Sequence, residues 1–207
     1  MVIVVDYGMG NLRSVQKALE RVGLEARVSA DPKMVRRADR LVLPGVGAFH
    51  DCLRNLEAGG FVEPVLEHIR AGRPFLGICL GMQLLFEESE EFGRWPGLGV
   101  LRGRVVRFPQ DARERDGRPV KVPHMGWNRL HLHGASPLFE GVEEGAFVYF
   151  DHSYYVVPGD ERVTAATTEH GLVFCSSVCS DNVVACQFHP EKSQRVGLKI
   201  LENFGRM

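Results

Sequence analysis

The chain has 207 residues, of which 25 are Lys or Arg and 26 are Asp or Glu, so its formal net charge is −1. This balance argues against a surface built to bind nucleic acid or anionic membranes, and no apolar run approaches the roughly 18–20 residues that span a bilayer. The N-terminal segment MVIVVD has no basic residue before its apolar run, which indicates a strand rather than a signal peptide.

The five cysteines include no C-x-x-C pair, and this argues against both a disulfide framework and a four-cysteine zinc site. We expect four of them to be small buried side chains in a reducing cytoplasm: Cys52, Cys175, Cys179 and Cys186. No P-loop and no metal-ligand cluster is visible in the sequence. The sequence therefore predicts no bound metal and no other cofactor.

The first half alternates short apolar strands with amphipathic helices. The Gly8-Met9-Gly10 turn has Arg13 where a dinucleotide fingerprint needs its third glycine, so we interpret it as a tight turn into a helix. In chain order the predicted elements are a strand over Val2–Val5, a helix with Leu12, Val15, Leu19 and Val22 on one face, a strand near Glu25–Val28, a short helix after Asp31-Pro32, a strand over Arg40–Leu43, a helix over residues 61–71 and a strand over Phe75–Ile78.

The second half is rich in β-strands separated by Gly, Pro and Asp-Asn turns. The predicted strands are Leu98–Phe108, Asn128–Leu132, Ala146–Phe150, Ser153–Val157, Val163–Thr168, Leu172–Val178 and Val183–Phe188, with a charged loop over residues 109–119 and a last helix over Gln194–Asn203. Apolar strands separated by helices are typical of a parallel sheet that is covered on both faces. We therefore predict one α/β domain over residues 1–207, with an open, mostly parallel twisted sheet and a β-rich C-terminal half.

The segment GICLG places Cys79 between a buried strand and a pattern that becomes helical after Gly81. It is the thiol counterpart of the G-x-S-x-G nucleophile elbow, in which flanking glycines relieve crowding at a sharp, strained turn. A helix N-terminus at this position stabilises a thiolate, and the Leu80 N–H points the right way to hold an oxyanion. From these five residues alone, a buried cysteine in a tight turn is an equally good interpretation.

A thiol nucleophile needs a base, and QFHPEKS supplies His189 at the end of an apolar strand with Glu191 two residues later. A carboxylate in that place can orient the imidazole and stabilise its protonated form. His-Pro-Glu by itself is usually only a strand end. Together with the elbow, it favours catalysis.

Cys79 in GICLGMQLLFE, with His189 and Glu191 in FHPEKS, resembles the triad of class I glutamine amidotransferases, whose fold is flavodoxin-like. The similarity covers essentially the whole chain. The segments DYGMGNLRSV, LPGVGAF, PHMGWN, HSYY and QFHPEKS resemble, more specifically, the glutaminase subunits that supply ammonia for imidazole glycerol phosphate synthesis.

This resemblance implies that Cys79 attacks the side-chain carboxamide of glutamine and that the second oxyanion donor is the Val46 N–H in PGVG. Gly45 and Gly47 suit a peptide that must flip or approach the substrate closely. An ordinary turn would explain Pro-Gly but would leave Gly47 without a role. Family members meet the amino-acid end of glutamine with the residues that correspond to Gln83, His152, Ser153 and Tyr154.

The resemblance also implies a partner, a (β/α)8-barrel synthase that forms a heterodimer with the chain and receives its ammonia. The expected interface residues flank the site in matching segments: Asn11, Met125, Trp127 and Lys192. From composition alone, Trp127 is equally well a core aromatic. The alternatives are a glutaminase subunit of another synthase, a cysteine hydrolase or peptidase of related fold, and a non-catalytic interaction module.

Overall fold

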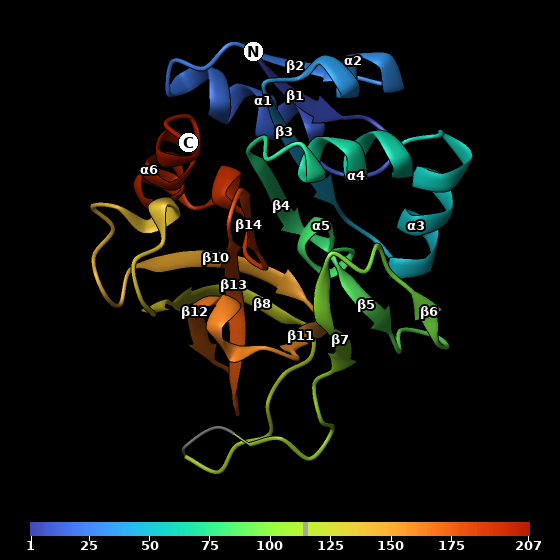
Figure 1. The fold of residues 1–207 in the computed structure, drawn as a ribbon. Coiled ribbons are helices and arrows are strands. Elements are labelled where there is room, and N and C mark those ends of the chain that lie inside the picture. The colour runs from blue at the N-terminus through green and yellow to red at the C-terminus, as the bar shows by residue number, and fades with distance from the viewer. Residues whose placement is uncertain (114–115) are drawn as a thin grey trace.

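The computed structural model describes residues 1–113 and 116–207, and its centre is a sheet of 12 strands (Figure 1). In chain order these strands are β1 (Val2–Val5), β2 (Ala26–Ser29), β3 (Arg40–Gly45), β4 (Phe75–Cys79), β5 (Phe86–Ser89), β6 (Trp95–Pro96), β7 (Leu101–Arg107), β9 (His131–Leu132), β11 (Tyr154–Pro158), β12 (Thr164–Glu169), β13 (Val173–Ser180) and β14 (Val183–Cys186). Two further strands, β8 (His124–Arg129) and β10 (Phe147–His152), form a separate antiparallel ribbon.

The helices lie mainly in the first half and at the C-terminus of the chain. They are α1 (Leu12–Arg21), α2 (Pro32–Arg37), α3 (Phe49–Ala58), α4 (Val62–Arg70), α5 (Leu80–Gln83) and α6 (Gln194–Phe204), with three 3-10 turns, η1 (Pro137–Phe139), η2 (Glu161–Val163) and η3 (Pro190–Lys192). Asp31 begins α2 as predicted, because its Oδ1 accepts from the Lys33 N–H at 2.9 Å.

The parallel half of the sheet has the strand order β2-β1-β3-β4-β14. This is the flavodoxin-like doubly wound order, so the predicted fold class is confirmed. From β14 onward the sheet continues through the antiparallel neighbour β13 into the β-rich half. Ligands of such sheets bind at the carboxyl edge of the parallel strands, which is where β3, β4 and β14 end together.

Both faces of the parallel half are covered by helices, which explains its unbroken apolar strands. Ile3 and Val5 of β1 share a core with the buried residues of α3 and α4, whereas Val2 and Val4 share the opposite core with those of α1 and α6. A strand buried on both faces has no reason to alternate apolar with polar residues.

The helical pattern predicted after Gly81 is wrong beyond one turn. Helix α5 ends at Gln83, and the chain then enters β5, a strand that the sequence did not indicate. The carbonyls of Leu84 and Leu85 accept hydrogen bonds from the N–H groups of Leu98 and Val100, both at 2.8 Å. Long-range pairing with the segment before β7 thus prevails over the local helical preference of an apolar run.

The strand predicted over Asn128–Leu132 is also misplaced. Strand β8 begins at His124, and β9 is a separate two-residue strand that pairs with β12. Pro123 and Gly126 argue against a strand by composition. The ribbon tolerates Gly126, with φ of 126°, because β8 pairs with β10 alone.

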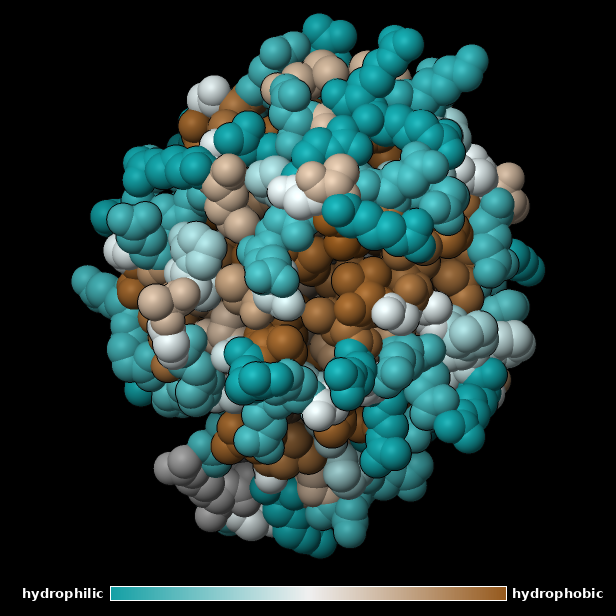
Figure 2. Space-filling model, viewed as in Figure 1, coloured by the Kyte–Doolittle hydropathy of each residue, from teal (hydrophilic) through white to brown (hydrophobic). Residues whose placement is uncertain are grey.

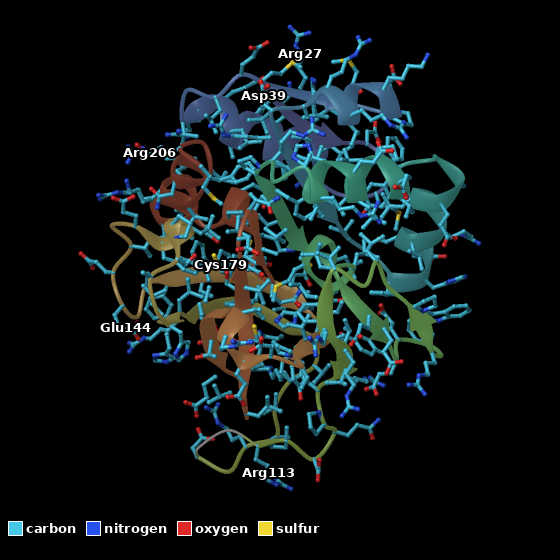
Figure 3. The ribbon with its side chains drawn as sticks, viewed as in Figure 1. Arg27, Asp39, Arg113, Glu144, Cys179 and Arg206 are labelled. Atoms are coloured by element: carbon cyan, nitrogen blue, oxygen red, sulfur yellow. The ribbon has the colours of Figure 1, made fainter. Side chains whose placement is uncertain are left out.

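The predicted charged loop over residues 109–119 lies at the periphery, although residues 114 and 115 fall outside the described part. Arg113 lies at the tip of the molecule, and the labelled charged side chains of Arg27, Asp39, Glu144 and Arg206 also point outward (Figure 3).

On the face shown in Figure 2, apolar residues gather in a band near α5 and β5. None of the helices in the described ranges is long and apolar enough to cross a membrane.

The contact between α5 and β3 yields a test of stability. A Cβ added to Gly81 would lie 1.8 Å from the Leu43 carbonyl oxygen. Gly81→Ala should therefore lower the free energy of unfolding by at least about 3 kcal/mol in urea denaturation. Gly99→Ala is the matched control because Gly99 has φ of 63° and open space around it. It should cost only about 1–2 kcal/mol of left-handed strain. Equal losses in the two variants would contradict the close contact.

Candidate active site

Cys79 stands at the carboxyl end of β4 with φ of 55° and ψ of −112°. Such a backbone is rare for a non-glycine residue and is held only where its surroundings enforce it. A Cβ on Gly77 would lie 2.6 Å from the Gly81 carbonyl oxygen. Glycines on both sides of Cys79 are therefore required by close backbone approach, as the elbow motif predicts.

The Cys79 side chain lines a pocket of about 290 Å³ although the residue is 4% exposed. Ten residues singled out from the sequence line this pocket: Val46, Gly47, Cys79, Leu80, Gln83, His152, Ser153, Tyr154, His189 and Lys192. Gly45 lies beside them, paired with Cys79 in the register of β3 and β4. A Cβ on Gly45 would lie 2.7 Å from the Leu80 Cβ, so this position also needs glycine.

His189 lies next to Cys79 and is held by Glu191. Its Nδ1 lies 2.9 Å from the Glu191 Oε1, and both side chains are almost fully buried. Burial by itself would lower the pKa of His189, but hydrogen bonds with Cys79 and Glu191 outweigh it and raise this pKa to about 10. The imidazole is thus a cation at neutral pH, with the Cys79 sulfur on one side and Glu191 on the other.

Two buried side chains hold the PGVG segment by hydrogen bonds to its carbonyl groups. The Tyr7 hydroxyl donates to the Pro44 carbonyl at 2.7 Å, and the Cys52 thiol donates to the Val46 carbonyl at 3.4 Å. Burial raises the pKa of Tyr7 well above its usual value and that of Cys52 to about 11, so both groups keep their protons at neutral pH. Val46 itself is 39% exposed at the edge of the pocket.

A chain of side-chain hydrogen bonds runs behind the pocket. The His124 Nδ1 lies 2.9 Å from the His152 Nε2, and the His152 Nδ1 donates to the Tyr154 carbonyl at 2.8 Å. Asn128 donates to the His124 Nε2 at 3.1 Å, so His124 donates in turn to His152. Burial, reinforced by neighbouring histidines, lowers the pKa of His124 to about 2. For His152 burial is also the main cause, and its pKa is about 3.

Sequence reasoning missed several pocket residues. Glu91 is 9% exposed, and its Oε2 accepts from the Phe49 N–H at 2.7 Å; burial raises its pKa despite that hydrogen bond. In the acidic run EESEE it looks like one more solvated charge, so no local signal marks it. Pro123 and Asp151 complete the lining, and Gln187 lies directly behind Cys79.

Of the four residues expected at a partner interface, Lys192 lines the pocket. Met125 and Trp127 are 61% and 45% exposed on the outer face of the β8–β10 ribbon, so Trp127 is not a core aromatic. Lys192 places its Nζ 5.4 Å from the centre of the Tyr149 ring, which packs edge-on against Trp127. Asn11 is exposed at the start of α1.

The other four cysteines do not line the pocket that contains Cys79. Cys52, Cys175 and Cys186 are buried as predicted, and burial raises the pKa of Cys175 to about 12 and that of Cys186 well above its usual value. Cys179 is only partly buried near the end of β13, so its predicted burial is wrong. Within residues 1–113 and 116–207, no group of His, Cys, Asp or Glu side chains could hold a metal ion.

Comparison with known proteins identifies the family of the chain. Residues 3–207 match the family described as glutamine amidotransferase class-I, and the chain belongs to that family. Within it, the chain is 62% identical to the imidazole glycerol phosphate synthase subunit HisH of Syntrophotalea carbinolica, over 100% of both chains. It is equally identical to the subunit of the same name from Geobacter sulfurreducens, over 100% of this chain and 98% of that one.

A solved structure described as PurLQS from Thermotoga maritima shares the fold. The TM-score is 0.75 at 19% identity, with 99% of this chain and 97% of that chain covered.

Because the pKa values of His124 and His152 are low, the free energy of unfolding should depend on pH. Both imidazoles stay neutral in the folded protein, whereas in the unfolded chain they take up protons below about pH 6.5. The free energy of unfolding should therefore fall by about 2 kcal/mol for each histidine between about pH 7 and pH 5. In His124→Gln, urea denaturation at the two pH values should show a loss about 2 kcal/mol smaller. The control His131→Gln, at an exposed position, should keep the wild-type loss. An unchanged loss in His124→Gln would contradict this account.

Proposed function

We propose that the chain is the glutaminase subunit of imidazole glycerol phosphate synthase, acting in histidine biosynthesis as a single amidotransferase domain over residues 1–207. The observation that carries the proposal is Cys79, held in a strained backbone at the edge of a pocket beside a His189–Glu191 pair. The full-length similarity to HisH subunits supports this choice within the family. Such a biosynthetic role fits the reducing cytoplasm that the cysteine pattern predicts.

In the first half of the reaction, the Cys79 thiolate attacks the side-chain carbonyl carbon of glutamine. A C–S bond forms, and the carbonyl oxygen takes the negative charge as the tetrahedral intermediate appears. The proposed donors to this oxygen are the N–H groups of Leu80 and Val46, which lie on neighbouring strand ends. His189, protonated at neutral pH because its pKa is raised, gives its proton to the departing amide nitrogen, and ammonia leaves.

In the second half, water hydrolyses the γ-glutamyl thioester. Neutral His189 takes a proton from the attacking water, the C–S bond breaks, and the electron pair returns to the Cys79 sulfur as glutamate is released. Glu191 stabilises the imidazolium that forms again, because its carboxylate faces the His189 Nδ1. The cycle therefore returns to the ion pair from which it started.

The pocket suits the amino-acid end of glutamine. Glu91 and Asp151 place negative charge at its lining, which favours the α-ammonium group. The Gln83 Oε1 is buried and has no partner among the described residues, so it is available to a substrate N–H. Backbone groups of His152 and Ser153 remain the proposed contacts, whereas both acceptor positions of the Tyr154 carbonyl are filled by Gln83 and His152.

The proposed partner is a (β/α)8-barrel synthase that uses the ammonia to make imidazole glycerol phosphate and an aminoimidazole carboxamide ribotide. The outer face of the β8–β10 ribbon supports this, because it exposes Met125, Trp127 and Phe147. Trp127 packs against Tyr149, and Lys192 of the pocket lies over the same ring. Exposed aromatic residues beside a site are typical of interface anchors. A peptidase is less well supported, since the full-length relatives are imidazole glycerol phosphate synthase subunits.

Cys79→Ser should separate the two activities of the complex. With the synthase partner present, the variant should lose glutamine-dependent synthesis but keep synthesis from added ammonium salt, because nucleophile and acceptor site lie on different chains. Product formation would be measured with each nitrogen source. Cys179→Ser, outside the pocket, serves as the control and should retain both activities. Loss of both activities in Cys79→Ser would rule out this division of labour.

We also propose that acceptor bound to the partner stimulates glutamine hydrolysis through a flip of the Gly45–Val46 peptide, which turns the Val46 N–H into the site. Val46→Pro should therefore assemble with the partner yet fail to respond to the acceptor. The substitution removes the proposed oxyanion donor, which in hydrolases is worth about 10²–10³ in rate. Glutamate release would be measured with and without acceptor. The control Val46→Ala keeps the N–H and should remain stimulated. Full stimulation of Val46→Pro would remove Val46 from the oxyanion hole and from any gating role.

A further inference from the structure

The side-chain amide of Gln187 lies next to the Cys79 sulfur. It follows β14 directly, is 0% exposed, and its backbone N–H donates to the Ser176 carbonyl at 2.9 Å. Its Nε2 lies 3.6 Å from the Cys79 Sγ, within hydrogen-bonding distance for sulfur. The mechanism described above assigns no task to this group.

The direction of this amide follows from its neighbours. The Tyr154 carbonyl oxygen can only accept, so the atom of Gln83 that faces it at 3.1 Å must be Nε2. The second hydrogen of that Nε2 points to Gln187 at 2.9 Å and therefore requires an oxygen there, which is Oε1. The opposite end of the Gln187 amide, its NH2 group, is then the end that faces the sulfur.

The Tyr154 carbonyl is itself held in place from a second side. The His152 Nδ1 donates to it at 2.8 Å, and His152 remains neutral because burial lowers its pKa. Gln83 is 2% exposed, so water does not compete for its Nε2 hydrogens. The O and N of a side-chain amide can exchange places by rotation, but the oxygen of a backbone carbonyl cannot. The Tyr154 carbonyl therefore fixes the orientation of the amide that donates to Cys79.

We propose that Gln187 is a fixed hydrogen-bond donor to the Cys79 sulfur that stabilises its thiolate form, and that Gln83 is the positioning residue that aims this donor. The inference rests on the proposed function in that Cys79 is the nucleophile. An N–H group that faces a charged acceptor in a dry site stabilises the charged form more than the neutral one.

The sulfur is a free thiolate before attack on glutamine and again when the thioester has been hydrolysed. A donor that prefers the thiolate favours both of these states over the thioester, whose sulfur is a weak acceptor. In the second half it assists departure of the sulfur when the C–S bond breaks and the electron pair moves onto it. Without the donor, more of the enzyme should rest as γ-glutamyl thioester during turnover.

Other titratable groups face Cys79 from every neighbouring element. Tyr7 after β1, Cys52 on α3 and Cys186 on β14 are kept neutral by burial, which raises the pKa of each. His189 and Glu191 form the charged pair at η3, and Glu91, Asp151 and Lys192 line the pocket. Substitutions of Gln187 and Gln83 leave all of these groups in place, so a change in thiolate formation can be assigned to the amides.

The test measures the rate of iodoacetamide labelling of Cys79 against pH in the full chain. The tryptic peptide 71–94 contains Cys79 as its single cysteine, and mass spectrometry of that peptide separates it from the other four. Gln187→Met, of similar length but without a donor, should raise the pH midpoint of labelling by about one unit. Gln187→Asn should raise it similarly, because the shorter side chain cannot reach the sulfur, and serves if the methionine variant does not fold.

The double variant tests the positioning role of Gln83. Gln83→Met should raise the midpoint by less than Gln187→Met, and it should add nothing when Gln187 is already methionine. Asn203→Leu is the control: its buried amide on α6 bonds the carbonyls of Leu138 and Glu140, so its loss should lower thermal stability and leave the midpoint unchanged. A wild-type midpoint in Gln187→Met, or an additive double variant, would overturn the proposal. Labelling needs neither glutamine nor the partner, so a failed glutaminase assay would leave this test valid.

Discussion

The site depends on one close contact, the approach of α5 to the end of β3. The Gly81 Cα lies so near the Leu43 carbonyl that no side chain fits, and Gly77 meets the Gly81 carbonyl in the same way. This packing turns the chain at Cys79 into a left-handed backbone that a cysteine would otherwise avoid. Because β3 and β4 are parallel neighbours, the same contact brings PGVG beside the nucleophile. Elbow and proposed oxyanion hole therefore share one structural cause.

A second constraint is the supply of hydrogen-bond partners in a dry interior. His189, Gln83, Gln187 and His152 are each less than a tenth exposed, and each makes at least one side-chain hydrogen bond. In such surroundings an unpaired polar group is costly and a paired one is rigid. The polar side chains of the site are thus ordered before substrate arrives.

Much of this was visible in the sequence. Local patterns predicted the parallel strands, the elbow and the His189–Glu191 pair, because each depends on residues close together in the chain. Strand β5, Glu91 and Gln187 were not predicted. Strand β5 pairs with β7, and Glu91 is held by the Phe49 N–H, 42 positions earlier in the chain. Gln187 matters only beside Cys79, 108 positions earlier. Such roles arise from contacts that no window of sequence contains.

The β8–β10 ribbon has one face at the surface and one face toward these buried contacts. Its pleat sends Met125 and Trp127 outward and His124 inward from the same strand, and Tyr149 and Phe150 alternate likewise on β10. The inner histidines connect through the Tyr154 carbonyl and Gln83 to the Gln187 amide behind Cys79. His152 ends strand β10 of the ribbon and donates to the Tyr154 carbonyl, which also accepts from Gln83, so the ribbon and the two amides meet at one hydrogen-bond acceptor.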